Sequence, residues 1–342
     1  MRRILALLPD GFTLAIAGTV AVASFIPCSG ESAKFFGWLT TAAIAVMFFM
    51  QGARLSREAV IAGLGHWRLH LTILGATFVL FPLLGFGFRA IFPHLMNPML
   101  LMGLLYICLL PSTVQSSIAF TSIARGNVPA AICSATFSTL FGVIVTPIFA
   151  SLLLKTHGDK GGGLASILPI FVELLLPFIA GQLLRPWIAG WVGRNSHLLK
   201  ITDRGSVILV VYTAFSAAVM RGLWHELPLS GFAEIIISNA VLLALVLLIT
   251  TFGSRMLGYK REDEIAIVFC GSKKSAATGV PMANILFSAS TVGLIVLPLI
   301  IFHQMQLMVC AVLAKRYASQ HEAALRQAEG AVEAVEAVEW AK

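Results

Sequence analysis

Two clusters of polar side chains interrupt long apolar stretches of this chain, and their residue types suit the binding of a small charged molecule. The first cluster follows the apolar run 99–110 and combines hydroxyl and amide groups: Pro111, Ser112, Thr113, Gln115, Ser116 and Ser117. The second follows the run 265–270 and adds two lysines: Gly271, Ser272, Lys273, Lys274, Ser275, Thr278, Gly279 and Pro281. Hydroxyl and amide groups can coordinate a cation or hydrogen-bond an anion, whereas ammonium groups attract anions and repel cations.

Backbone chemistry explains why each apolar helix should stop at its polar cluster. Pro111 cannot donate a hydrogen bond to the preceding turn, and glycines flank the second cluster. Unpaired backbone groups inside a bilayer are costly unless protein, water or a ligand satisfies them. Matching interruptions in the two halves of a membrane protein are typical of a transporter's binding site.

Two interpretations of the lysines stay open. Half-helices that meet inside a membrane bring their negative carboxyl ends together, and the ammonium group of Lys273 or Lys274 could neutralise those ends. Alternatively, a lysine contacts an anionic ligand directly. Because adjacent residues do not share a helix face, we expect the two side chains to have different roles, one at the helix ends and one facing a cavity.

Glu173 is the one carboxylate in the middle of an expected membrane span, between Pro169 and Pro177. We expect it to pair with a lysine of the second cluster or to carry a coupling proton, although a watery vestibule would also suit it. His66 and His70 favour an interfacial anchor over a metal site. Other polar residues in or near spans are interpreted as interhelical hydrogen-bond partners: Gln51, Asn239, His303, Gln304 and Gln306.

The composition defines a membrane protein, because 58% of the 342 residues are hydrophobic and only 12% are charged. Apolar runs of about 20 residues can cross a bilayer as helices. They predict ten spans, at about 12–27, 35–53, 69–88, 99–124, 128–154, 164–184, 205–224, 233–257, 264–287 and 291–314. The expected fold is therefore an all-α polytopic membrane protein whose fourth and ninth helices are discontinuous.

The basic residues predict how these spans are oriented. With a cytoplasmic N-terminus, 17 of the 24 Lys and Arg residues face the cytoplasm and 5 face the other side, the remaining two being Lys273 and Lys274. This asymmetry predicts that both termini are cytoplasmic. The net charge of +8 therefore reflects topology, and no nucleic-acid partner is expected. The N-terminal segment favours a retained first span over a cleaved signal peptide.

The two halves of the chain correspond in pattern. Pro111 and Gly271 lie 160 residues apart, and 163 residues separate the starts of the fifth and tenth spans. Since each half contains an odd number of spans, the second repeat is expected to be inverted relative to the first. We expect repeats at 1–157 and 158–316, with crossed discontinuous helices, and an acidic cytoplasmic tail at 317–342 to which no function is assigned.

Three segments resemble the bacterial, SBF-like branch of the bile acid:sodium symporter family: PSTVQSSIAFTSIARGN (111–127), CGSKKSAATGVPMA (270–283) and LPLIIFHQMQLMVCAVLA (297–314). The resemblance covers nearly the whole chain. It implies a transporter with a panel domain of spans one, two, six and seven and a core domain of spans three to five and eight to ten. It also implies a multi-pass protein of the bacterial inner membrane.

The family's sodium ligands are largely replaced in this sequence. The resemblance implies that the family's serine–asparagine pair falls on Ser117 and Ile118, and that its glutamine of the third span falls on Thr77. Its glutamine–asparagine–serine falls on Lys273, Lys274 and Ser275, and its glutamate falls near Phe269 or Cys270. The hydroxyls of its fifth span fall on Ser134, Thr136 or Ser138. A weak Na⁺ site near Ser117 and Thr77 is what remains, and no other metal site is expected. Two ammonium groups at the same place repel Na⁺.

The expected function is secondary transport of an organic anion, such as a carboxylate or sulfonate, by alternating access. Coupling to Na⁺ or to a proton through Glu173 and a lysine is considered, no cofactor is expected, and the only other partner is the lipid bilayer. Lacking any nucleotide-binding or hydrolase motif, the chain is not expected to be an enzyme. The alternatives are a cation/proton antiporter, although no aspartate occurs between Gly52 and Gly158, and a ligand sensor without transport. The substrate's identity and the oligomeric state stay open.

Overall fold

The computed structural model describes residues 11–54, 66–93, 96–154, 164–220, 222, 229–289 and 291–340. Within these ranges the chain is helical and contains no strand. The elements are α2 (Gly11–Phe25), α3 (Gly30–Arg54), α5 (Trp67–Gly75), the π-helical turn η2 (Ala76–Leu80), α6 (Phe81–Ile91), α7 (Pro98–Leu109), α8 (Gln115–Ile123), α9 (Val128–Leu153), α10 (Leu164–Arg194), α11 (Ser196–Val219), α13 (Leu229–Met256), α14 (Arg261–Gly271), α15 (Ala276–Leu286) and α16 (Val292–Trp340).

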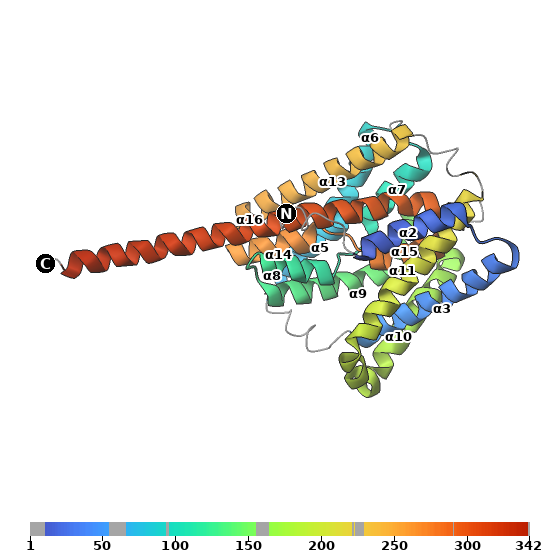
Figure 1. The fold of residues 1–342 in the computed structure, drawn as a ribbon, viewed down its shortest axis with the longest axis horizontal. Coiled ribbons are helices and arrows are strands. Elements are labelled where there is room, and N and C mark those ends of the chain that lie inside the picture. Colours follow the sequence, from blue (N-terminus) through green and yellow to red (C-terminus); the bar gives the residue numbers. More distant parts are fainter. Residues whose placement is uncertain are drawn as a thin grey trace.

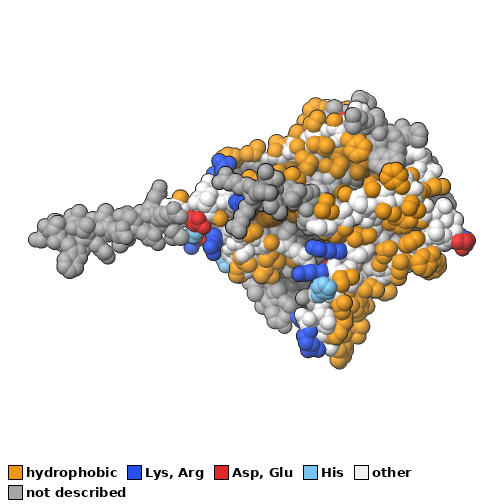
Figure 2. All heavy atoms as spheres, in the orientation of Figure 1, with side chains coloured by type: hydrophobic (Ala, Val, Ile, Leu, Met, Phe, Trp, Pro, Cys, Tyr) orange, Lys and Arg blue, Asp and Glu red, His pale blue; other side chains and the backbone are white. Residues whose placement is uncertain are grey.

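Six helical stretches are long and apolar enough to cross a membrane: Gly30–Arg54, Trp67–Ile91, Val128–Leu153, Val172–Arg194, Ser230–Met256 and Val292–Ala323. Two shorter apolar helices, Leu14–Phe25 and Pro98–Leu109, accompany them in the part that the structure describes. Apolar side chains cover much of the outer surface in Figure 2, and large ones such as Trp38 and Leu183 are mostly exposed. Such a surface suits a lipid environment, so the chain is a multi-pass membrane protein.

The helices pack as two interacting groups (Figure 1). In one group, α3 packs against α10 and α11, and α11 packs against α2. In the other, α7 packs on α16, α14 contacts α5, α8, α9 and α13, and α13 packs on α16. Contacts of α11 with α15 and α16 join the two groups. Residues from both groups line the cavity described below.

Two glycines allow α3 and α10 to approach each other closely. A Cβ added at Gly52 would overlap the Phe178 carbonyl oxygen, and one added at Gly181 would overlap the Phe49 carbonyl oxygen. Small residues at such contacts let membrane helices pack backbone against backbone. The backbones of α3 and α10 therefore lie in direct contact at Gly52 and Gly181.

One helix spans the expected start of the acidic tail at 317. Helix α16 runs without interruption from Val292 to Trp340 and continues past the bundle toward the C-terminus (Figure 1). At the other end, α2 begins at Gly11, the first described residue, close to the expected start of the first span at 12.

A buried carboxylate connects the end of α13 and the start of α14 to the middle of α16. Glu264 on α14 is 3% exposed and accepts hydrogen bonds from Arg255 Nη2 at 3.0 Å, Arg261 Nη1 at 2.7 Å and the Tyr317 hydroxyl at 3.0 Å. Arg255 lies on α13 and Tyr317 on α16. Charge-assisted bonds to several partners fix a carboxylate more firmly than a single surface ion pair does.

We expect Glu264→Gln to destabilise the protein by about 1–3 kcal/mol, because it removes the charge and one acceptor position from this network. The thermal unfolding midpoint in detergent should fall by several degrees. Glu262→Gln is the matched control, since Glu262 is exposed on the same helical turn. Equal midpoints for the two variants would show that the network does not hold α13, α14 and α16 together.

Candidate binding site at the two helix breaks

Both expected helix interruptions are present. Helix α7 ends at Leu109 and α8 begins at Gln115, while α14 ends at Gly271 and α15 begins at Ala276. The two interruptions touch: the Ser275 amide donates to the Pro111 carbonyl at 2.9 Å. They form one structural unit in which segments 160 residues apart in the sequence satisfy each other's backbone groups.

Hydroxyl groups of the first break satisfy the carboxyl end of α14. Ser112 Oγ donates to the Cys270 carbonyl at 2.6 Å, and Ser117 Oγ donates to the Phe269 carbonyl at 3.0 Å. These carbonyls belong to the last turn of α14, which has no further helical donors. Two of the hydroxyls expected to bind a ligand, those of Ser112 and Ser117, therefore bond to the backbone.

Lys274 satisfies the carboxyl end of α7. Its Nζ donates to the carbonyls of Cys108 at 3.0 Å and Leu110 at 2.7 Å, and to that of Thr77 at 2.8 Å. Thr77 lies in η2, and Pro82, five residues later, has no N–H to donate back to it in a π-helical pattern. The geometry thus favours a role in which this fully buried ammonium group compensates the partial negative charge at the carboxyl end of α7.

Lys273 is also fully buried and points elsewhere. Its Nζ donates to the Ser116 carbonyl at 2.9 Å and lies 3.8 Å from the centroid of the Phe120 ring. A cation over an aromatic face gains electrostatic stabilisation, which grows when water is excluded. The two lysines have different partners, as expected, but neither of them lines the cavity described below.

The Gln306 side chain hydrogen-bonds the backbone of the unwound segment before α15, as a neighbouring peptide group would. Gln306 Oε1 accepts from the Lys274 amide and Gln306 Nε2 donates to the Lys274 carbonyl, both at 2.8 Å. His303 Nδ1 lies 2.9 Å from Gln306 Nε2 and contributes to the cavity wall. Ser275 Oγ accepts from the Thr278 amide at 3.2 Å and so caps α15.

A cavity of about 650 Å³ adjoins both breaks. The first break contributes Thr113 to Ser116, and the second contributes Ser275, Ala277 and Thr278. The opposite wall comes from α3, α10 and α11, with apolar contributions from Phe178 and Leu199. The complete lining is Phe12, Gln51, Arg54, Thr113, Val114, Gln115, Ser116, Ala119, Thr136, Thr139, Leu140, Phe178, Leu199, Lys200, Asp203, Arg204, Ser275, Ala277, Thr278, His303 and Leu307.

The cavity is electropositive. Arg54, Lys200 and Arg204 line it together with one acid, Asp203, whose Oδ2 accepts from Arg54 Nη1 at 2.7 Å. The amino ends of α8 and α15 also open on the cavity, and a helix amino end carries partial positive charge. Such a lining favours an anion, while the apolar side chains suit a lipophilic body.

The structure brings only some of the predicted site residues to the cavity. Those that line it are Thr113, Gln115, Ser116, Thr136, Ser275 and Thr278. Ser112, Ser117, Lys273 and Lys274 serve the backbone of the breaks instead, and Ser272 is buried away from the cavity. Ser134 Oγ lies 2.7 Å from the His70 ring, and the Thr77 hydroxyl donates to the Ile73 carbonyl at 2.9 Å. Glu173 is exposed on α10 and is absent from the cavity lining.

The groups at the expected Na⁺ positions make hydrogen bonds within the protein. Lys274 Nζ donates a hydrogen bond to the Thr77 carbonyl, and the Ser117 hydroxyl donates one to the Phe269 carbonyl. Two ammonium groups lie where a hard cation would need oxygen ligands and negative charge. Within the described ranges, no group of three His, Cys, Asp or Glu residues could hold a metal ion.

Four charged lining residues were not singled out as site residues from the sequence: Arg54, Lys200, Asp203 and Arg204. Sequence reasoning placed them at the cytoplasmic ends of spans and used the basic ones only for orientation. The available signal was an aspartate within a basic segment directly before an expected span. Gln51 and His303, expected as interhelical partners, also line the cavity.

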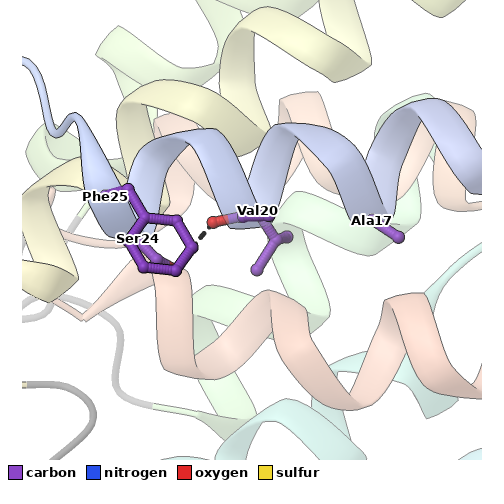
Figure 3. Close-up of a pocket in the computed structure, with 5 residues that line it drawn as sticks. Ala17, Val20, Ser24 and Phe25 are labelled. Atoms are coloured by element: carbon purple, nitrogen blue, oxygen red, sulfur yellow. Dashed lines mark hydrogen bonds between the residues drawn. The ribbon is translucent and has the colours of Figure 1, made fainter.

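A second hollow lies along one face of α2 (Figure 3). It is lined by Ala17, Val20, Ala21, Ser24 and Phe25, and the Ser24 hydroxyl donates to the Val20 carbonyl at 2.7 Å. The lining contains no charged group, and its one hydroxyl is used within the helix. This surface suits lipid contact rather than binding of an ion.

A polytopic helical protein in which two interrupted helices meet beside a charged cavity has the architecture of a secondary transporter. Comparison with known proteins agrees, because residues 10–319 match the SBF-like CPA transporter family. The chain belongs to this family, which is one of transporters and not of enzymes.

Similar proteins occur in bacteria and animals. "Uncharacterized protein PA2026" of Pseudomonas aeruginosa is 56% identical over 92% of this chain and 95% of its own length. "Putative symporter YfeH" of Escherichia coli is 53% identical over 95% of this chain and 97% of its own length. "Sodium/bile acid cotransporter 7" of Rattus norvegicus is 30% identical over 79% of this chain and 80% of its own length.

Proposed function

We propose that this protein is a secondary transporter that carries an organic anion through the membrane by alternating access. The observation that carries this proposal is the cavity. It adjoins both breaks, and three basic side chains, one acid and the amino ends of two helices line it. Its volume of about 650 Å³ falls within the range usual for small-molecule sites. The name of the rat relative, a sodium/bile acid cotransporter, supports an amphipathic anion as the substrate class.

The substrate is proposed to carry a carboxylate or sulfonate on a lipophilic body. The charged group would lie near Arg54 and the helix amino ends, and the body would lie against Leu140, Phe178 and Leu199. Lys273 and Lys274 contribute indirectly, because they keep the two breaks in the geometry that forms one wall.

The proposed topology has ten spans in two inverted repeats of five, with α7–α8 and α14–α15 as the crossed fourth and ninth helices. Both termini are proposed to be cytoplasmic, in the inner membrane of a bacterium. The asymmetry of basic residues supports this orientation, and the bond between Ser275 and Pro111 supports the pairing of the two breaks.

Coupling to a proton is proposed in preference to Na⁺, because ammonium groups occupy the expected sodium positions. We expect purified protein in proteoliposomes to accumulate taurocholate about tenfold for an inward gradient of one pH unit, if one proton accompanies each anion. Radiolabelled uptake with and without Na⁺ measures this. Strict dependence on Na⁺ would reject proton coupling while leaving anion transport intact.

The same assay discriminates the other functions. Exchange of Na⁺ for protons without any anion uptake would favour a cation/proton antiporter. Saturable binding of taurocholate without uptake would favour a sensor, and in that case deletion of 320–342 would test whether the tail serves a partner.

A further inference from the structure

The ion pair between Arg54 and Asp203 lies on the cavity wall formed by α3 and α11. Arg54 is the last residue of α3, and its Nη1 lies 2.7 Å from Asp203 Oδ2. The side chains are 30% and 14% exposed, so both groups are largely shielded from bulk water. A pair in this setting is more sensitive to loss of either partner than a surface pair is.

Three of the five side-chain nitrogen and oxygen atoms of this pair have no hydrogen-bond partner among the described residues. Arg54 Nε and Nη2, Asp203 Oδ1 and the neighbouring Gln51 Oε1 are buried and have no hydrogen-bond partner among the described residues. Buried polar atoms without partners cost about 1–3 kcal/mol each, so four of them on three residues that line the cavity are a cost that a polar ligand bonded to these groups would relieve. Two of the unpaired atoms are donors on one guanidinium and two are acceptor oxygens.

Building on the proposed function, we propose that Arg54 binds the anionic group of the substrate and that Asp203 carries the coupling proton. When the anion bonds to Arg54 in place of Asp203, the aspartate takes up one proton from water. When the anion leaves, Asp203 returns that proton to water and pairs with Arg54 again. One monoanion and one proton therefore move together, without net charge.

The chemistry of the pair drives this exchange. A guanidinium presents donors in a planar fork that a carboxylate or sulfonate can engage with two bonds. An incoming anion and an ionised Asp203 would repel each other at such a distance, and a carboxylate that loses its cation in a shielded site favours its neutral form. Protonation of Asp203 removes both penalties at once.

The other charged and titratable groups around Asp203 come from three helices. Helix α11 itself contributes Lys200 and Arg204, α3 contributes Arg54, and α16 contributes His303. Helices α2 and α15 contain no charged residue, and no charged residue of α10 lines the cavity. Asp203 is the one carboxylate in the lining, whereas Glu173, the sequence-based candidate, is exposed outside it.

Calorimetric titration of the purified full-length protein with taurocholate tests the inference. Performed at pH 7 in two buffers of different ionisation enthalpy, it counts the protons taken up on binding. We expect about one proton per anion for the wild type, and tighter binding as pH falls, by up to about tenfold per pH unit. Taurocholate is a sulfonate that stays ionised, so the proton cannot enter on the ligand.

Two variants separate the roles. Asp203→Asn resembles the neutral acid and should bind taurocholate with no proton uptake, while Arg54→Gln should bind at least about tenfold more weakly. Glu322→Gln and Arg316→Gln remove matched charges from exposed positions on α16 and should behave as the wild type does. Should Asp203→Asn fail to fold, the proton count of the wild type still tests the coupling, because uptake of no proton would overturn it.

Each outcome has a distinct meaning. Wild-type binding without proton uptake, or uptake that persists in Asp203→Asn, would overturn the coupling role and leave anion binding intact. Unchanged affinity in Arg54→Gln would overturn its assignment to the substrate. No binding of taurocholate by the wild type would instead reject the proposed function itself.

Discussion

Replacing Lys274 with methionine is expected to lower the thermal unfolding midpoint by roughly 5–10 °C. The substitution leaves the carbonyls of Thr77, Cys108 and Leu110 buried without their donor. Each lost partner costs about 1–3 kcal/mol, offset in part because an ammonium group no longer has to be buried. The net loss should be about 3 kcal/mol.

Unfolding can be followed through the cysteines with a thiol-reactive fluorescent dye, because Cys108, Cys270 and Cys310 are buried in the folded protein. Lys315→Met is the matched control, since Lys315 is exposed on α16 and does not line the cavity. A Lys274→Met variant that melts with the wild type but no longer binds taurocholate would contradict the structural role. That result would favour the other interpretation, in which Lys274 contacts the substrate directly.

Reversing two charges on the cavity wall should reduce taurocholate affinity by roughly 100-fold. In the double variant Lys200→Glu with Arg204→Glu, two basic lining residues become acidic. The cavity lining then contains more acidic than basic side chains. Because both positions are exposed, water screens each charge, and we expect about 1–2 kcal/mol from each reversal. Binding of radiolabelled taurocholate to detergent-solubilised protein measures the effect.

The control for this variant is Lys315→Glu with Arg316→Glu, an adjacent basic pair on α16 outside the cavity. It makes the same change in net charge and should leave affinity within a few-fold of the wild type. Higher salt should weaken wild-type binding. An equal loss in both double variants would mean that diffuse charge attracts the anion and that the cavity wall has no special part.

The helix breaks could be predicted from the sequence because their causes are local. Pro111 lacks a donor, glycines flank the second cluster, and both clusters follow apolar runs. Even the idea that a lysine compensates helix ends follows from the charge of those ends, and the three carbonyl bonds of Lys274 fit it. The positions of the breaks therefore need only the local sequence, whereas the carbonyl partners of Lys274 lie 164 to 197 positions away.

The cavity could not be predicted in the same way, because it forms between segments that are remote in sequence. Arg54 and Asp203 are separated by 149 positions and meet only when α3 packs on α11. Hydropathy locates both residues at the ends of spans but does not indicate which way they face. Glu173 illustrates the converse. Its mid-span position suggested a pair with a lysine, a proton carrier or a group in a watery vestibule, and the side chain is exposed on α10 outside the cavity lining.

A structure of the protein with bound taurocholate, determined by electron cryo-microscopy, tests the central claim most directly. The account predicts the sulfonate within hydrogen-bonding distance of the Arg54 guanidinium, beside the amino ends of α8 and α15, with Lys273 and Lys274 still bonded to backbone carbonyls. Taurocholate seated on the ammonium group of Lys273 or Lys274, or bound away from this cavity, would contradict it.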